Sequence, residues 1–186
     1  MIKMPLFAAA ALVAAAQAAT AAAPSVTGLT PGYSFEEYDG SAELGIGAVD
    51  VDRTLFFVDE KAVGGLKSWF VFFDSQRPSG VTATLHFDQP IVAIYSTRDD
   101  LEMTTPTYGV SNVSYGSDRY TGLERGDVLL WSGNSNTVYI DWTVLDPGDH
   151  IRVITAVPEP GTQAMLAAGL LATGWLSRRR FGNKAG

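Results

Sequence analysis

"SWFVFFD", residues 68–74, is apolar at every position from Trp69 to Phe73. A strand that is apolar on both faces is expected inside a sheet that is covered on each side. A second stretch, "TVYIDWTVL" at residues 137–145, alternates between apolar and polar positions, as a half-buried strand does. The residues on its apolar face are Val138, Ile140, Trp142 and Val144. Both stretches predict β-structure.

Similar short runs of β-branched and aromatic residues recur through the middle of the chain, separated by Gly, Pro, Asn and Asp. This spacing, without a long helical period, is typical of a sandwich or jelly roll. We predict an all-β fold, an antiparallel, jelly-roll-like β-sandwich over residues 24–156. The predicted strands are 33–38, 43–51, 54–63, 67–74, 81–88, 91–96, 107–115, 127–132, 137–145 and 150–156. We also predict a single helical turn in residues 97–105, capped by Thr97, and a flexible lead-in at residues 24–32.

The charge of this predicted domain is strongly acidic. Without its ends the chain keeps eight basic and nineteen acidic residues, a net charge of about −11. Nucleic acid and anionic lipid would repel such a domain, so we expect no nucleic-acid partner. Cysteine is absent, which excludes disulfides and thiolate chemistry.

The first residues have the three parts of a secretory signal peptide. Lys3 supplies a positive start, residues 6–16 are uninterruptedly apolar, and Ala16-Gln17-Ala18 fits the small-x-small cleavage rule. We predict a helical signal peptide at residues 1–18. Cleavage is predicted after Ala18, with alternative sites as far as Ala22.

The last residues combine an apolar stretch with three arginines. Residues 162–177 are mostly Ala, Leu, Gly and Met, and a helix of this length reaches only about 25 Å, a marginal membrane span. Arg178, Arg179 and Arg180 follow at once, which predicts a cytoplasmic tail by the positive-inside rule. We predict a C-terminal transmembrane helix at about residues 162–177.

A proline-containing motif precedes this predicted helix. Val157-Pro158-Glu159-Pro160, the apolar stretch and Arg178 to Arg180 together resemble the PEP-CTERM sorting signal of Gram-negative bacteria. The resemblance implies that residues 157–182 are a sorting signal read by exosortase, with the chain held transiently in the inner membrane. The prolines disfavour helix, so the motif should stay extended and accessible to a processing enzyme.

Residues that could carry chemistry in the middle of the chain are few. His86 and His150 lie on predicted strands, where lone imidazoles are usually structural. Carboxylates that could bind Ca²⁺ occur in two groups. These are Asp50 and Asp52 on one predicted strand face, and Asp99, Asp100 and Glu102 in a predicted loop. The spacing of a twelve-residue calcium loop is missing, so we predict no metal site and no cofactor.

Tyrosines are the remaining candidates for a binding site. Aromatic faces pack against the apolar faces of sugar rings, although tyrosine is also common in strands for packing alone. The candidates for a sugar platform are Tyr108, Tyr115, Tyr120 and Tyr139.

These features together predict an exported protein of the bacterial surface or exopolysaccharide matrix. Signal peptidase and exosortase would process it, and the β-sandwich would be a binding or structural domain rather than an enzyme. Association with exopolysaccharide is what the PEP-CTERM resemblance implies. The alternative is a secreted hydrolase that uses a pair of carboxylates on an extracellular polymer, because the separation of such a pair in space is not visible in a sequence.

Overall fold

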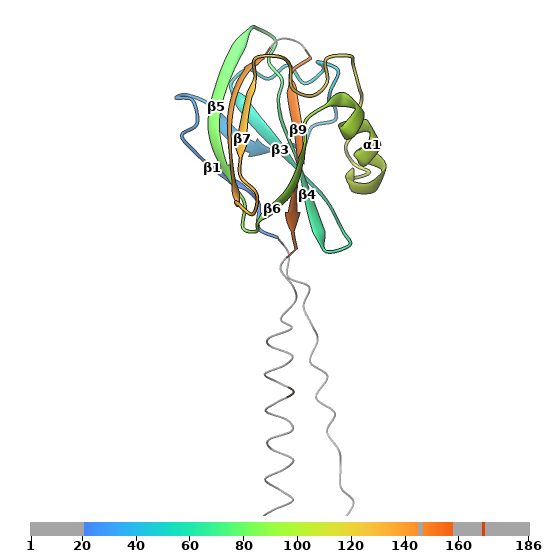
Figure 1. Ribbon diagram of the computed structural model, residues 1–186. Helices are drawn as coiled ribbons and strands as arrows, with labels where there is room; N and C mark the ends of the chain where they lie inside the picture. The colour runs from blue at the N-terminus through green and yellow to red at the C-terminus, as the bar shows by residue number, and fades with distance from the viewer. Residues whose placement is uncertain (1–20, 145–146, 158–168, 170–186) are drawn as a thin grey trace, which may run out of the picture. The chain divides into compact units, whose positions relative to one another are not determined.

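The computed structural model describes residues 21–144, 147–157 and Gly169. The β domain forms one compact unit, Thr20–Pro158. Two sheets and a single helix make up its described part (Figure 1). The signal peptide with Ala16 and Ala18, and the sorting residues Pro158, Glu159, Pro160 and Arg178 to Arg180, lie outside the described residues. Among the described residues, no helix is long and apolar enough to cross a membrane.

The five-stranded sheet has the order β2-β3-β4-β9-β6. Its strands are β2 (Ser34–Glu37), β3 (Thr54–Val63), β4 (Leu66–Phe73), β6 (Ile91–Tyr95) and β9 (Asp149–Ala156). β4 is central and holds the SWFVFF stretch, and every residue of β4 after Leu66 is buried. The prediction of a central strand covered on both faces is therefore confirmed.

The four-stranded sheet has the order β1-β5-β8-β7. Its strands are β1 (Ser25–Thr27), β5 (Ser79–His86), β7 (Val128–Trp131) and β8 (Thr137–Val144). On β8 the predicted apolar face, from Val138 to Val144, is buried and the intervening residues are not. The alternation predicted from the sequence is confirmed.

The two sheets pack face to face around one apolar core, as predicted for a sandwich. Trp69 and Phe73 from the five-stranded sheet meet Trp142 and Val81 from the four-stranded sheet. Every strand pair is antiparallel except β2 with β3, which is parallel and departs from the predicted all-antiparallel arrangement. A long connection, residues 38–53, separates these two strands and permits the parallel pairing.

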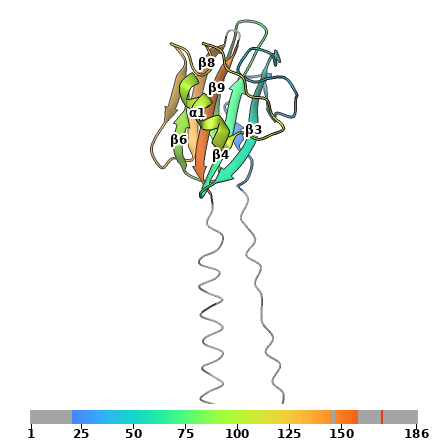
Figure 2. The same cartoon turned by 90° about the vertical axis from the view of Figure 1, so that its right-hand side faces the viewer.

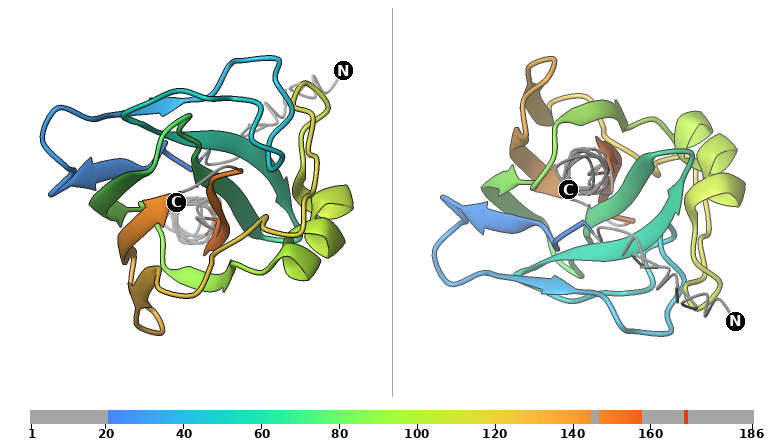
Figure 3. Two further views of the ribbon diagram at one scale, coloured as in Figure 1. Left: turned by 90° about the horizontal axis from the view of Figure 1, so that it is seen from above. Right: turned by 90° about the horizontal axis from the view of Figure 1, so that it is seen from below.

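A third layer covers the outer face of the five-stranded sheet. Helix α1 (Arg98–Tyr108) lies across β9 and β4 (Figure 2), and from above it is seen outside both sheets (Figure 3). Under this layer a second apolar cluster joins Phe70 and Phe72 of β4 to Leu101 of α1 and Leu44. This cluster explains why β4 is buried on both faces.

Eight of the ten predicted strands are present and two are wrong. Residues 45–47 form a turn, in which Gly45 and Gly47 have positive φ angles of 82° and 70°. The rest of residues 43–51 is irregular except for Leu44, which makes an isolated bridge to Tyr115. Residues 107–115 are also not a strand. The helix that was predicted as one turn runs for 11 residues and occupies the start of that segment.

The predicted lead-in at residues 24–32 was also wrong in part. Ser25–Thr27 form β1, which pairs with β5 in register with His86, Leu85 and Thr84. The composition of this segment did not show the pairing, because β1 is stabilised by a partner strand far along the chain.

Candidate functional site

The end of β9 leads directly into the motif at Pro158. β9 is paired on both sides, with β4 and with β6. At its end the amide of Ala156 donates to the carbonyl of Pro90 (3.1 Å), and the amide of Val157 donates to the carbonyl of Gly65 (2.8 Å). The backbone is therefore held by hydrogen bonds up to the residue that precedes Pro158 in the sequence.

The chain also enters the domain at this end. The amide of Ala22 donates to the Asp88 carboxylate at 3.0 Å. Asp88 belongs to the same β5–β6 turn as Pro90, whose carbonyl holds Ala156. The start and the end of the folded domain therefore contact a single turn.

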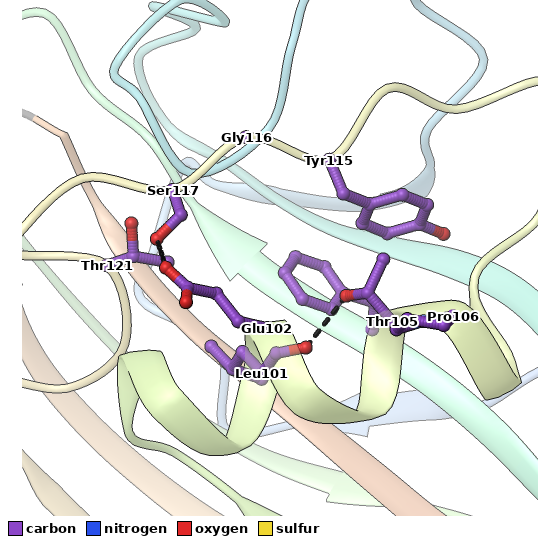
Figure 4. Close-up of a pocket in the computed structure, with 9 residues that line it drawn as sticks. Leu101, Glu102, Thr105, Pro106, Tyr115, Gly116, Ser117 and Thr121 are labelled. Carbon is purple, nitrogen blue, oxygen red and sulfur yellow. Dashed lines mark hydrogen bonds between the residues drawn. The ribbon is translucent and has the colours of Figure 1, made fainter.

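A small pocket opens between α1 and the loop that follows it (Figure 4). Its volume is about 200 Å³. It is lined by Phe70, Leu101, Glu102, Thr105, Pro106, Tyr115, Gly116, Ser117 and Thr121. The Ser117 hydroxyl donates to the Glu102 carboxylate across its mouth, and the Tyr115 ring stands edge-on to Phe70 with centroids 5.6 Å apart. Aromatic walls with a few polar groups at the rim are suited to a small polar ligand such as one sugar ring.

A buried ion pair lies beneath α1 beside this pocket. The Arg152 guanidinium donates to both carboxylate oxygens of Glu60, at 2.7 and 2.8 Å, and neither side chain is exposed. The same guanidinium donates to the Leu101 carbonyl and to the hydroxyls of Thr104 and Thr105 in α1. Arg152 thus joins β9, β3 and the helix, which explains how a helix with only two buried side chains is held on the sheet.

Tyr115 stands between the ion pair and the pocket. Burial raises the pKa of its hydroxyl far above the ordinary value, and the Glu60 charge raises it further. The amide of Val110 donates to this oxygen at 3.4 Å. Tyr115 therefore stays neutral and presents an aromatic wall to the pocket.

The four candidate tyrosines do not share one surface. Tyr115 lines the pocket, and Tyr108 is the last residue of α1. Tyr120 is exposed in the following loop, with the Arg119 guanidinium 4.3 Å from its ring centre. Tyr139 is exposed on β8, on the outer face of the other sheet. Of the four, the structure brings only Tyr115 into the pocket.

The carboxylates considered for Ca²⁺ are placed differently from the prediction. Asp50 and Asp52 lie in a loop, not on a strand, and Asp52 accepts a hydrogen bond from Ser75 at 2.7 Å. Asp99, Asp100 and Glu102 lie in the first turns of α1, which agrees with the predicted helical turn capped by Thr97 and not with the loop in which they were grouped as Ca²⁺ ligands. In the described ranges no three His, Asp or Glu side chains gather as metal ligands.

Sequence reasoning did not single out Asp149, the first residue of β9. Its side chain is 2% exposed, and burial raises its pKa to about 8, with the charges of Asp127 and Glu124 adding to the effect. Asp127 is itself held by the amides of Thr143 (3.0 Å) and Glu124 (2.8 Å). Asp149 is therefore mostly protonated at neutral pH. Asp127 and Glu124 belong to a loop more than twenty residues earlier in the chain, so no local sequence motif identifies Asp149.

The two histidines occupy contrasting places. His150 is fully buried and stacks on Phe72 with ring centres 6.0 Å apart, and burial lowers its pKa to about 4. It is therefore neutral at ordinary pH. His86 is partly exposed on β5 and contacts the Thr27 hydroxyl at 2.7 Å.

The described part is thus a mostly β sandwich domain with one helix, and its last strand, β9, ends at Ala156, two residues before Pro158 in the sequence. Residues 156–180 match the family model of the PEP-CTERM protein-sorting motif. The chain therefore carries a PEP-CTERM sorting motif, as the sequence predicted, and this motif implies export, transient membrane anchoring and processing by exosortase. No curated protein and no solved structure matches the chain.

Proposed function

We propose that this protein is a non-catalytic component of the bacterial surface or of the exopolysaccharide matrix, delivered there by exosortase. The observation that carries the proposal is the position of the sorting motif. Its match begins at residue 156, the last residue of β9, so the whole β domain precedes the signal as cargo. The domain is released when the segment beyond Pro158-Glu159-Pro160 is removed.

The β domain, as cargo, binds a ligand or serves as a structural component. A matrix component needs a folded body that stays soluble among polymer chains, and a net charge of about −11 favours solubility. The pocket beside α1 offers a site for one sugar residue, with Tyr115 as the aromatic wall and Glu102 and Ser117 at the rim. The ligand class proposed is a neutral exopolysaccharide, since an acidic polymer would be repelled.

The sorting step is tested by Pro158→Ala combined with Pro160→Ala in the native host. The variant should remain in the inner membrane with an intact C-terminus, because the motif read by the enzyme is lost. The matched control is Pro31→Ala with Pro78→Ala, which alters two exposed prolines of the domain. The intact mass of each protein in membrane and extracellular fractions is measured. Normal release of the Pro158 and Pro160 variant would refute the proposal.

A further inference from the structure

The five-stranded sheet ends in a row of apolar residues where the chain leaves the fold. In the strand register Val63 of β3 pairs with Leu66 of β4, and Leu66 pairs with Ala156 of β9. On the other side of β9, the carbonyl of Pro90 at the start of β6 holds the Ala156 amide. This apolar row therefore crosses three adjacent strands, β3, β4 and β9, and reaches the residue that precedes β6.

Both flanks of this row are open to solvent. Val63 is 41% exposed on one side of β9, and Val92 is 53% exposed on the other. Val157, the residue after β9, is hydrogen-bonded to Gly65 in the turn that follows Val63 and joins β3 to β4. Apolar side chains exposed together around one point are characteristic of an interaction surface, and here that point is the exit of the chain.

The sorting motif lies very close to this row along the chain. Four residues, 158–161, separate Val157 from Thr162, where the apolar stretch begins. An extended chain covers at most about 17 Å from Val157 to Thr162. An enzyme that binds Pro158-Glu159-Pro160 must therefore meet the end of the domain while the peptide is bound.

Detaching the end of β9 from the sheet, which would lengthen the free segment before Thr162, is unfavourable. Freeing Val157 and Ala156 would break their hydrogen bonds to Gly65 and Pro90, and would uncover Thr155, which is fully buried. Because β9 is paired on both sides, peeling it away is costly. The enzyme has to approach the folded domain instead.

We propose that this apolar row of Val63, Leu66, Ala156 and Pro90, together with Val92 and Val157 beside it, is the surface by which the folded domain docks on exosortase during processing. The inference rests on the proposed function, since it requires sorting by that enzyme. These side chains carry no charge, and Asp88, which lies in the same turn as Pro90, accepts a hydrogen bond from the amide of Ala22. An uncharged surface on a strongly acidic domain fits an enzyme that acts at the membrane.

The test replaces the two exposed valines by glutamine, Val63→Gln with Val92→Gln, in the full-length chain in its native host. The matched control is Val51→Gln with Ile46→Gln, because these side chains are 39% and 40% exposed and belong to the loop 38–53, which is hydrogen-bonded at Val51 to Asp74, beyond the opposite end of β4 from Leu66. Pulse-chase labelling and intact mass report the fraction processed. We expect processing of the exit variant to slow about fivefold or more, and that of the control to stay near the wild-type rate. Processing of the exit variant at the wild-type rate would overturn the proposal.

A second variant leaves every residue of the domain unchanged. A flexible eight-residue Gly-Ser spacer is inserted between Val157 and Pro158, which separates the motif from the surface and lowers their effective concentration. Processing should slow several-fold if the enzyme contacts both. If the spacer variant is processed at the wild-type rate or faster, the enzyme gains nothing from contact with the domain, and the proposed docking surface is refuted.

Two parallel measurements separate the possible failures. If the Pro158 and Pro160 variant is released normally, sorting itself fails; if it is retained while the exit variant is processed normally, only the docking surface fails. Membrane association is also compared in cells that lack exosortase. A loss of membrane binding by the exit variant in those cells would show that the row contacts lipid, which overturns the assignment to the enzyme.

Discussion

The buried pair of Glu60 and Arg152 leads to a strong prediction about stability. Glu60→Gln keeps the size of the side chain but removes its charge, so the guanidinium stays buried without a counter-ion. The loss also affects α1, because Arg152 donates to three of its residues: Leu101, Thr104 and Thr105. Removing one partner of a fully buried ion pair costs about 3–5 kcal/mol of unfolding free energy.

The matched control is the same substitution at an exposed ion pair. Glu102 lies 3.6 Å from Arg98, and the two side chains are 51% and 44% exposed. Solvent screens this pair, so Glu102→Gln should cost less than about 1 kcal/mol. The comparison isolates the effect of burial, because both variants change a glutamate to a glutamine.

The assay is urea and thermal unfolding of the exported protein. Glu60→Gln should lower the melting temperature by roughly 10–20 °C, given the entropy of unfolding expected for a domain of this size. A second variant, Glu60→Leu with Arg152→Met, removes both charges and should cost less than Glu60→Gln alone. A cost for Glu60→Gln below about 1 kcal/mol would refute the reasoning, since it would mean that the pair is solvated.

Two further predictions concern a titratable group and the pocket. Asp149 is protonated when folded and ionised when unfolded between about pH 4 and 8, so wild-type stability should fall as pH rises through this range, with a slope approaching about 1.4 kcal/mol per pH unit. Asp149→Asn should flatten that slope in urea unfolding from pH 5 to 8, and parallel profiles would contradict the assignment. For the pocket, Ser117→Ala with Glu102→Gln should weaken binding of a neutral oligosaccharide from the host polymer about tenfold by calorimetry, whereas Asp99→Asn on the same helix should not. Equal affinities of all three proteins would remove the pocket from the binding site.

Most strands were predictable because their signals are local. The alternation of β8 and the continuous apolar run of β4 report directly which faces are buried. The wrong predictions concern segments whose conformation depends on contacts with another part of the chain. The predicted helical turn stopped at residue 105, before Pro106, and a strand was predicted from residue 107, yet α1 continues to Tyr108. The guanidinium of Arg152 and a buried Leu101 hold this segment in helical form.

The candidate sites are likewise of two kinds, one visible in the sequence and one formed only by folding. The sorting motif is a linear peptide, so Val157 to Pro160 and the following arginines were visible in the sequence, and they lie within the range 156–180 that matches the family model. The pocket was not visible as a site, although Tyr115 was named as a candidate. Its walls come from β4, α1 and the loop that contains Ser117, and only the folded chain brings them together.

By itself the sequence determined that the domain is mostly β and that it carries a sorting motif that implies export, because strand periodicity and the motif are encoded in neighbouring residues. Only the tertiary structure decided that Glu60 and Arg152, 92 positions apart, form a buried pair. It also decided that Ala22 and Ala156 meet one turn, and that apolar side chains surround the exit of β9. These features arise from contacts between distant segments, whose free energy depends on burial and geometry in the folded chain.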